Sequence, residues 1–268
     1  MFIPSGWSAA EVEHELIEPP TRAFVRFPAL EVLNRPDWAQ LTCHLFPAGG
    51  FNEVSRAMLS DESADRIIDE TLAHYANRGL TFRWSVMPGS TPRDLAARLT
   101  ARGMVSTEIA GMACSTALEH QPSPNVAVQE IGLDRLDDYS RIMATGWGAP
   151  LGALNDYHHV ALSDPQRAQR FFLATCEGEP AAVASATIFP RSIYLLGAVV
   201  LPRFRRRGVY GALIAARLAL ARTLGIPLAT SHAIASTSAP LLERAGFDTW
   251  FRFLSFSPPR HAGDSVHG

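Results

Sequence analysis

The sequence contains no lysine, and all 24 of its basic residues are arginines. Its three cysteines, Cys43, Cys114 and Cys176, are widely spaced without a Cys-x-x-Cys pair, so they indicate neither a disulfide framework nor a zinc site. The apolar run "IYLLGAVVL" falls well short of the roughly 20 residues that a membrane-spanning helix needs. Because no basic leader with an apolar core opens the sequence, we expect a cytoplasmic protein without a metal or a membrane partner.

What the sequence does contain is typical of a folded protein. Of its 268 residues 47% are hydrophobic and 19% are charged, which predicts a substantial buried core. The formal net charge is −2, which argues against a surface devoted to nucleic acid or anionic lipid. Any basic function must therefore be local.

A Pro-rich polar stretch at residues 118–128 is the best candidate for a linker. It predicts an N-terminal domain at 1–118, a second domain at 126–257 and a flexible tail at 258–268. The segments "LAARLTARGM" and "APLLERAGF" end the two halves in the same way, which indicates a diverged internal duplication. Before the linker we expect strands at 21–28, 39–47 and 80–88, with helices at 61–79, capped by Asp61 or Ser63, and at 91–103.

The second half begins with a strand at 126–131 and a helix at 133–147, which places Trp147 in the core. A loop at 148–160, a helix at 164–170, a hairpin at 170–190 and a buried strand at 193–202 follow. The helix after Gly208 has one apolar stripe, and Arg217 faces elsewhere. Strand 227–235, helix 238–246 and strand 247–256 complete an α/β fold of mixed sheets flanked by helices.

The junction "LPRFRRRGVYGAL" places four arginines between the buried strand and this helix. The first N–H groups of a helix are unpaired and attract anions, and arginines beside them add charge-assisted hydrogen bonds. A solvated surface cluster and a nucleic-acid patch are the alternatives, although a patch lacks interleaved aromatic residues. No Walker A or Gly-x-Gly-x-x-Gly pattern is present, so nucleoside triphosphates and NAD are disfavoured.

The run "AVVLPRFRRRGVYGALI" resembles motif A of the GCN5-related N-acetyltransferases (GNAT), whose pattern is Gln/Arg-x-x-Gly-x-Gly/Ala. Arg205 and Gly208 match it, whereas Tyr210 stands where Gly or Ala is usual. The resemblance covers about residues 125–256, and the first half resembles a degenerate second copy without the cofactor loop. It implies tandem GNAT-like sheets, with acetyl-CoA bound by the C-terminal half.

The resemblance also implies which residues hold the coenzyme. Backbone amides from Ala198, Val199 and Val200 would contact pantetheine and the thioester. The diphosphate would lie on the loop and the first turn of the helix, at Arg205, Arg206, Arg207, Gly208, Val209, Tyr210 and Gly211.

The chemistry implied is direct attack of an amine on the thioester, and an amine needs a base at neutral pH. The family often places a carboxylate on this strand, but no Asp or Glu lies between Ser192 and Leu201. His232 is the best-placed substitute, with Tyr194 positioning a water, and a hydrogen-bonded strand histidine is the alternative interpretation. Leu242 replaces the tyrosine that protonates the leaving thiolate in many relatives.

Asp156, Tyr157 and His158 are candidates for the acceptor pocket, with a simple surface loop as the alternative. The acceptor is expected to be a small-molecule amine or a peptide, and a homodimer is one open state of assembly. A catalytically silent acyl-CoA-binding or partner-binding module is the second hypothesis. A nucleic-acid-associated regulator is the third, although no nucleic-acid partner is expected.

Overall fold

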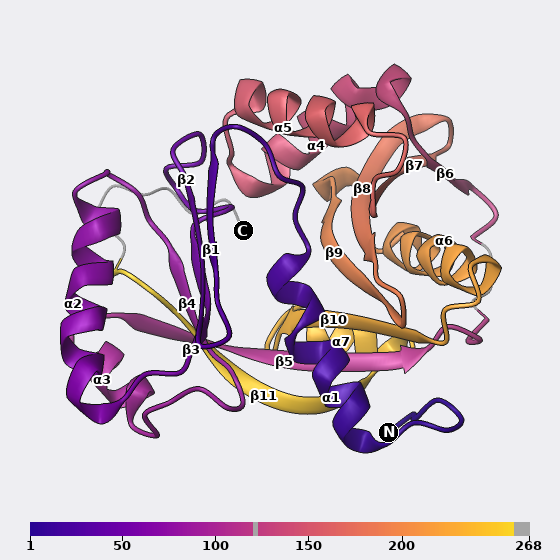
Figure 1. The fold of residues 1–268 in the computed structure, drawn as a ribbon. Coiled ribbons are helices and arrows are strands. Elements are labelled where there is room, and N and C mark those ends of the chain that lie inside the picture. Colours follow the sequence, from indigo (N-terminus) through magenta and orange to yellow (C-terminus); the bar gives the residue numbers. More distant parts are fainter. Residues whose placement is uncertain (120–122, 260–268) are drawn as a thin grey trace. The chain divides into compact units, whose positions relative to one another are not determined.

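The structure is a computed structural model that describes residues 1–119 and 123–259 (Figure 1). The chain forms two compact units. Of the described residues, unit 1 comprises Met1–Val25 and those within Ala110–Trp250, and unit 2 comprises Arg26–Ile109 and residues 251–259. The first 25 residues thus pack with the second half, whereas the sequence division assigns them to the first domain. The predicted tail falls almost wholly on residues 260–268, outside the described part.

Unit 2 contains one mixed sheet with strand order β1-β2-β3-β4-β11, of which β11 contributes its second half. The strands β3 and β4 run parallel, and the pairs β1–β2, β2–β3 and β4–β11 are antiparallel. Helices α2 and α3 bury Ile68 and Leu99 in a core around Trp84. The elements are β1 (Leu30–Asn34), β2 (Trp38–Cys43), β3 (Glu53–Ala57), α2 (Asp61–Ala76), β4 (Arg83–Val86) and α3 (Leu95–Ala101).

Unit 1 contains the strand order β5-β10-β9-β8-β7-β6, and here β9 and β10 are the parallel pair. The strands β5 (Val105–Ser115) and β11 (Asp248–Ser257) contribute residues to both units. The other elements are α1 (Ala9–Ile17), η1 (Pro19–Arg22), β6 (Val126–Glu130), η2 (Leu133–Arg135), α4 (Leu136–Trp147), α5 (Leu151–Ser163), β7 (Gln169–Cys176), β8 (Glu179–Ile188), β9 (Ser192–Val200), η3 (Pro202–Phe204), α6 (Val209–Thr223), β10 (Leu228–Ile234) and α7 (Ala239–Arg244).

The two faces of the unit 1 sheet are covered by different helices (Figure 1). Ala184, Ile193 and other small or branched side chains of β8 and β9 pack with Leu213 of α6 in the largest core cluster. Successive side chains of a strand point to opposite faces, so Val183 and Ser185 face the side of α4 and α5. This arrangement puts the start of α6 directly after the end of β9.

The α/β class is confirmed, and several elements lie where the sequence places them. Helix α2 occupies most of 61–79, although its N-cap is Ser60, one residue before Asp61. Helix α6 begins immediately after Gly208, and β7 and β8 form the predicted hairpin. These segments have strong local signals, namely a regular apolar period and a glycine-centred turn.

Three predicted elements are wrong. Residues 21–28 contain no strand, because Pro19 and Pro20 start a 3₁₀ turn in which the Ala23 N–H donates to the Pro20 carbonyl (3.1 Å). Residues 148–160 are largely helix α5, with Leu154 and Ala161 on its buried side. The predicted helix at 164–170 is instead a turn, since the Asp164 carboxylate accepts the Gln166 N–H (2.8 Å), and β7 follows.

The sequence analysis missed helix α1 and the strands β1, β3 and β5. Helix α1 has a capping box, in which the Ser8 hydroxyl accepts the Glu11 N–H (3.3 Å) and the Glu11 carboxylate accepts the Ser8 N–H (2.8 Å). The pattern Ser-x-x-Glu before Val12 and Leu16 was therefore a readable signal. Strands β3 and β5 have weaker signals, since β3 is short and the first residues of β5 are exposed.

Candidate functional site

The strands β9 and β10 separate soon after they begin. Their parallel pairing covers only Leu228 with Ser192 through Thr230 with Tyr194, although β9 continues to Val200. On its other side β9 stays paired with β8 to the end. The second half of β9 therefore has one edge without a ladder partner, and polar backbone groups at such an edge are available to a ligand.

The orientation of the backbone at this edge follows from the hydrogen bonds of β9. The Leu201 N–H donates to the Ala181 carbonyl on β8 (3.0 Å). Because N–H groups alternate between the two edges of a strand, the N–H of Val199 also faces β8 and that of Val200 faces the opening. Among Ala198, Val199 and Val200, Val200 is thus the residue best placed to offer its N–H.

A β-bulge interrupts β9 just before this point. The pairs Ser185 with Leu196 and Val183 with Val199 leave one extra residue on β9. Gly197 lies at φ +61°, in the left-handed region that favours glycine. The indole of Trp147 lies close by, since Cζ2 is 3.6 Å from where a Cβ on Gly197 would stand, and Trp147 is 47% exposed and so not in the core. Sequence reasoning missed the bulge, although a glycine inside a strand is a recognised signal for one.

The loop between β9 and α6 presents unpaired backbone N–H groups. Arg206 (φ +63°) and Gly208 (φ +78°) both have left-handed backbones, and such residues form the concave main-chain turns that bind anions. Gly208 is the N-cap of α6 and provides no side-chain cap, and the first turn contains no acidic residue. A Cβ on Gly208 would lie 2.3 Å from the Ser123 hydroxyl, and the positive φ strains any other residue, so this position favours glycine. This helix N-terminus is open to an anion.

The four arginines of the loop differ in their partners. Arg203 forms an ion pair with Glu179 (2.7 Å), and Arg207 forms one with Glu177 in the turn between β7 and β8. Within the described part of the chain, the side chain of Arg205 has one hydrogen bond, a long one to the Val200 carbonyl (3.5 Å). Arg206 has no hydrogen bond or ion pair with any described residue. Arg205 and Arg206 are therefore the side chains most available to an anionic ligand.

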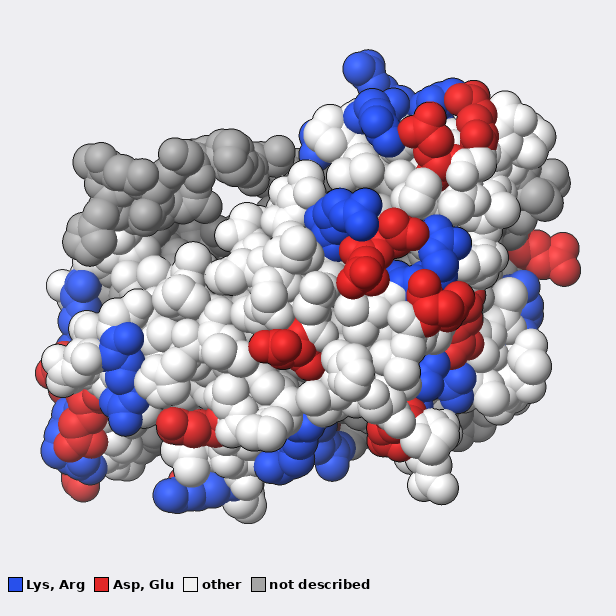
Figure 2. Space-filling model, turned by 90° about the horizontal axis from the view of Figure 1, so that it is seen from above, with Lys and Arg blue, Asp and Glu red and all other residues white. Residues whose placement is uncertain are grey.

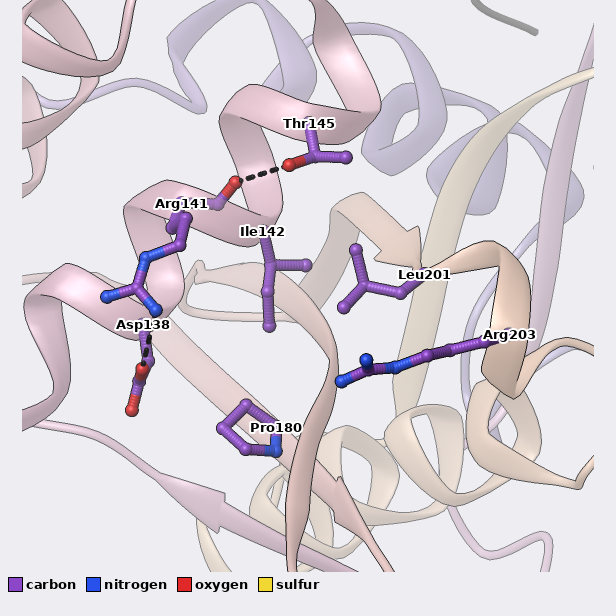
Figure 3. Close-up of a pocket in the computed structure, with 7 residues that line it drawn as sticks. All are labelled: Asp138, Arg141, Ile142, Thr145, Pro180, Leu201 and Arg203. Atoms are coloured by element: carbon purple, nitrogen blue, oxygen red, sulfur yellow. Dashed lines mark hydrogen bonds and ion pairs between the residues drawn. The ribbon is translucent and has the colours of Figure 1, made fainter.

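Two pockets adjoin the loop. One, of about 410 Å³, is lined by Arg207 and Gly208 together with residues 123–125 and Cys176. The other, of about 210 Å³, lies between α4 and the end of β9, where Leu201 and Arg203 face Ile142 and Thr145 (Figure 3). On the surface seen in Figure 2 basic side chains lie beside acidic ones, without a broad basic field.

The remaining coenzyme candidates lie in the first turn of α6. Val209 is buried in the core, and burial raises the pKa of Tyr210, which packs against the same cluster. Gly211 has open space where a Cβ would stand. These three residues can therefore offer their main-chain N–H groups, and the phenol of Tyr210 belongs to the packing of α6.

His232 and Tyr194 lie together near the point where β9 and β10 separate. Their ring centroids are 5.5 Å apart in an edge-on arrangement. His232 Nε2 lies 2.8 Å from the carbonyl oxygen of Leu16 in α1. Because a carbonyl can only accept, Nε2 carries the hydrogen in the neutral ring and Nδ1 is the basic nitrogen. Sequence reasoning could not foresee this contact, because its partner lies 216 positions away.

Helix α1 is held over these strands by polar contacts. The Ser192 hydroxyl donates to the buried Glu15 carboxylate (2.5 Å), and Arg191 donates to Glu11 (2.8 Å). The guanidinium of Arg191 also stacks over Trp7, 3.8 Å from the ring centroid. The N-terminal segment thus fixes the surroundings of the His232 ring.

The other histidine candidate is part of the core. His158 is buried in α5, where its Nδ1 lies 2.8 Å from the Ser140 hydroxyl, and burial lowers its pKa to about 3. Tyr157 donates its hydroxyl hydrogen to Gln169 (2.6 Å) and is also buried. Asp156 is exposed on the same helix. The predicted acceptor loop is therefore wrong for Tyr157 and His158, because helical spacing turns both side chains inward.

Two further observations bear on the chemistry. Leu242 is buried in α7 within the core cluster, so it cannot donate a proton. Within residues 1–119 and 123–259 no three His, Cys, Asp or Glu side chains are placed to hold a metal ion, and the three cysteines are free and buried. No helix of the described chain is long and apolar enough to cross a membrane.

The sequence interpretation placed the side chain of Arg217 wrongly. It faces the core side of α6 and is only 1% exposed, although we expected it to face away from the apolar stripe. Burial lowers its pKa to about 10, so the group remains charged at neutral pH. An arginine flanked by alanine and leucine could have signalled burial, but helical spacing alone favours a solvated face.

Comparison with known proteins bears on the fold and on part of the chain. Residues 136–247 match the model of the acetyltransferase (GNAT) family. A GCN5-related N-acetyltransferase from Kribbella flavida is 14% identical, with a TM-score of 0.67 and coverage of 96% of this chain and 97% of that one. A tandem GNAT protein from the clavulanic acid biosynthesis pathway is 14% identical, with a TM-score of 0.56 and 96% coverage of each chain.

A conserved protein of unknown function from Staphylococcus epidermidis is 13% identical, with a TM-score of 0.64 and coverage of 88% of this chain and 96% of that one. No curated protein matches the sequence. The chain therefore has a GNAT-like α/β fold. Residues 136–247 are a GNAT-family domain, and the N-terminal half has a GNAT-like fold.

Proposed function

We propose that the protein is an acetyl-CoA-dependent N-acetyltransferase whose acceptor amine attacks the thioester directly. The observation that carries this proposal is the opening between β9 and β10, which leads to the uncapped N-terminus of α6. A coenzyme that combines a diphosphate with an extended thioester arm needs both features side by side. We also propose that the protein acts in the cytoplasm and that the site belongs to residues 126–257.

The residues present fit the coenzyme. Gly208 lets an anion approach the first N–H groups of α6, and Arg205 and Arg206 are the side chains most available to neutralise its charge. The Val200 N–H, which faces the opening, can hydrogen-bond the thioester oxygen. An N–H aimed at charge that develops during reaction contributes about 3 kcal/mol of stabilisation.

His232 and Tyr194 would manage the proton of the acceptor. An alkyl ammonium with a pKa near 10.4 costs about 4 to 5 kcal/mol to deprotonate at pH 7 without a base. With its Nε2 hydrogen held by the Leu16 carbonyl, His232 can accept that proton at Nδ1, directly or through a water beside Tyr194. The amine then forms the amide bond as the carbon–sulfur bond breaks, and coenzyme A leaves as its thiolate.

A binding module without turnover is the second candidate, and the burial of Leu242 favours it. A thiol with a pKa near 8.5 is nevertheless a tolerable leaving group at neutral pH without a general acid. Turnover is therefore expected to be slower without the acid, but it does not require one.

The test has two steps. The first is isothermal titration of the full chain with acetyl-CoA, for which saturable binding is expected. The second is a free-thiol assay with acetyl-CoA across aminoglycosides, polyamines, amino acids and peptides, for which at least one amine should accelerate thiol release. Absence of binding would overturn the proposal, and binding with no thiol release from any amine would establish the second candidate.

A further inference from the structure

Arg217 is a buried cation whose hydrogen bonds go to main-chain carbonyls. Its Nε donates to the Leu213 carbonyl (2.9 Å) and one terminal nitrogen donates to the Ser185 carbonyl (3.2 Å). No Asp or Glu of the described residues forms an ion pair with it. Burying a guanidinium without a carboxylate is expensive, and a leucine would fill the same place on an apolar helix face more favourably. Helix packing alone therefore does not explain this residue.

The carbonyl that Arg217 reaches belongs to the β8–β9 ladder. The Ile131 N–H donates to the Phe171 carbonyl (2.9 Å), so the backbone groups of Phe171 face β6. Ser185 on β8 is paired with Phe171 on β7, and because the backbone groups of Phe171 face β6, those of Ser185 face β9. Arg217 thus reaches into the ladder from the α6 face of the sheet, at the residue paired with Leu196.

This point is where the ladder is broken by the bulge. Two residue steps on β8, from Val183 to Ser185, match three steps on β9, from Leu196 to Val199. A bulge disrupts the local hydrogen bonds and bends the strand that carries the extra residue. Arg217 adds a charged donor at the last ladder pair before the extra residue. It therefore holds the bulge from the side that the helix covers.

We infer that Arg217 is a positioning residue that fixes the bulge of β9 and thereby aims the Val200 N–H at the thioester oxygen. Helix α6 carries both Gly208 at its start and Arg217 in its third turn. One rigid helix thus sets the distance between the diphosphate and the acetyl group. Arg217 itself does not touch the coenzyme, and the inference rests on the proposed function.

The inference predicts an effect that depends on the acetyl group. If Arg217 orients only the Val200 N–H, which would contact the thioester oxygen, its loss weakens the binding of acetyl-CoA. The binding of coenzyme A stays almost unchanged, because the loop at Gly208 is not altered. If the role of Arg217 were purely structural, its loss would weaken the binding of both ligands equally. The ratio of the two dissociation constants therefore separates the two roles.

The experiment is isothermal titration of coenzyme A and acetyl-CoA into wild-type protein, Arg217→Met and Arg217→Lys. Arg222→Met is the matched control, because Arg222 lies on the same helix and also donates to carbonyls, those of Thr116 (2.8 Å) and Leu118 (3.1 Å), away from the bulge. We expect wild type to prefer acetyl-CoA about fivefold, the worth of one well-aimed hydrogen bond. Arg217→Met should lose the preference for acetyl-CoA, while its affinity for coenzyme A changes less than about twofold. Arg217→Lys should retain part of the preference, and Arg222→Met should retain all of it.

Gly197→Ala provides a second route to the bulge should Arg217→Met fail to fold. Its Cβ would lie 3.1 Å from the Ser185 hydroxyl at a left-handed φ, so the bulge must shift, and the same loss of preference is expected. A folded Arg217→Met that keeps the wild-type ratio, or that weakens both ligands equally, overturns the inference. A wild type that binds both ligands equally also overturns it, whereas a wild type that binds neither overturns the proposed function with it.

Discussion

Helices α2 and α6 stand in equivalent places in the two units, yet their N-termini have opposite chemistry. Each follows a strand that is paired in parallel with the next strand along the chain. In α2 the Ser60 hydroxyl accepts the Ser63 N–H (3.3 Å), and Asp61 and Glu62 occupy the first turn. In α6 the N-cap is Gly208, without a side-chain cap and without an acid in the first turn. The repeat of strand and helix is shared, and the capacity to bind an anion is not.

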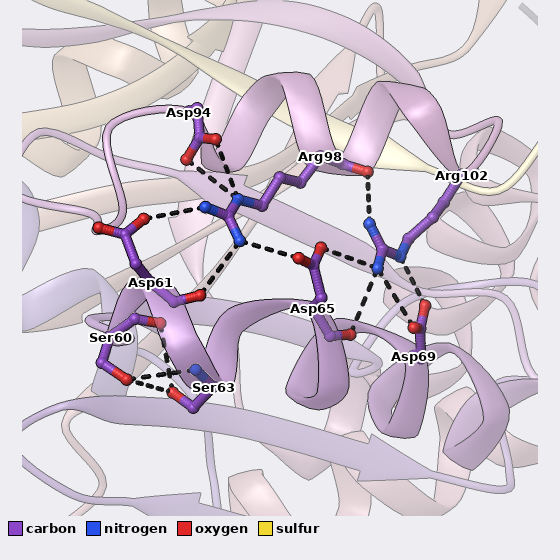
Figure 4. Close-up of polar contacts among 8 residues, drawn as sticks. All are labelled: Ser60, Asp61, Ser63, Asp65, Asp69, Asp94, Arg98 and Arg102. Atoms are coloured by element: carbon purple, nitrogen blue, oxygen red, sulfur yellow. Dashed lines mark hydrogen bonds and ion pairs between the residues drawn. The ribbon is translucent and has the colours of Figure 1, made fainter.

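The arginines of the two units show the same difference. In unit 2, the guanidinium groups of Arg98 and Arg102 bind carboxylates of α2, and Arg98 also binds the carboxylate just before α3 (Figure 4). Asp65 bridges them, at 3.0 Å from Arg98 and 2.9 Å from Arg102. The hydrogen bond from Arg102 lowers the pKa of Asp69, so this carboxylate stays ionised. These arginines hold two helices together, whereas Arg206 beside α6 has no carboxylate partner among residues 1–119 and 123–259.

The comparison teaches that the local residues at a helix start, more than the fold, decide whether it can hold a phosphate. A capped N-terminus with two acids repels an anion, and an uncapped one beside arginines attracts it. The start of α2, with its Ser60 cap and two acids, is therefore unfavourable for an anion.

The largest expected effect comes from making α6 resemble α2. Gly208→Asp introduces a carboxylate at the N-cap and should weaken acetyl-CoA binding about 100-fold or more, through lost hydrogen bonds and charge repulsion. Isothermal titration checks this result. Gly152→Ala is the control, because Gly152 lies in α5 and its Cβ would meet open space, and this variant should bind acetyl-CoA normally. Binding that survives Gly208→Asp would show that the loop is not the diphosphate site.

A second prediction compares the histidines of the two units. His158 has a folded-state pKa of about 3 against 6.5 when unfolded, so the unfolded chain binds more protons between these values. Stability is therefore full above pH 6.5 and falls as the pH decreases, by about 2 kcal/mol at pH 5. His158→Gln should remove this part of the acid sensitivity in urea unfolding at pH 7 and pH 5.

His74→Gln in unit 2 is the matched control. Burial also lowers the pKa of His74, but that side chain is less deeply buried and bonds to Thr42 near the surface (3.0 Å). Its replacement should change the acid sensitivity less. An equal effect of the two substitutions would contradict the assignment of the acid-sensitive group to α5.

The third prediction concerns the cap of α2. Ser60→Ala removes the side chain that accepts the Ser63 N–H and should destabilise the protein by about 1 kcal/mol. Urea unfolding measures this loss, and titration with acetyl-CoA should show unchanged affinity. A changed affinity would mean that the start of α2 takes part in binding, against the comparison drawn above.

The smallest effect is expected for a single loop arginine. Arg206→Ala should weaken the binding of acetyl-CoA about threefold, because one charge near the diphosphate is lost. For the same reason, binding should depend less on the salt concentration. Arg203→Ala is the comparison variant, since its guanidinium already pairs with Glu179 (2.7 Å). Both variants are titrated with acetyl-CoA at low and at high salt. A larger loss of affinity in Arg203→Ala than in Arg206→Ala would contradict the prediction.

Much of the site could be predicted from the sequence because its signals are local. The four arginines, Gly208 and the apolar stripe of α6 lie within one short segment, and the glycine-centred hairpin before them is equally compact. Such features depend on backbone preferences that neighbouring residues determine. The loop assignments for α5 failed for the opposite reason, since Leu154 and His158 turn inward only because α4 and β7 are there to receive them.

Other parts depend on contacts between distant segments. The Leu16 carbonyl fixes the tautomer of His232 from 216 positions away, and Ser185 meets Arg217 across 32. Nothing within either segment indicates its partner. The bulge at Gly197 is partly predictable. The glycine indicates a bulge locally, but the direction in which β9 bends depends on its register against β8.

The most direct measurement is a crystal structure of the full chain with acetyl-CoA. The account predicts diphosphate oxygens within hydrogen-bonding distance of the N–H groups that begin α6 after Gly208, with the thioester oxygen at the Val200 N–H. A coenzyme bound at the start of α2, or one whose diphosphate lies away from Gly208, would contradict it.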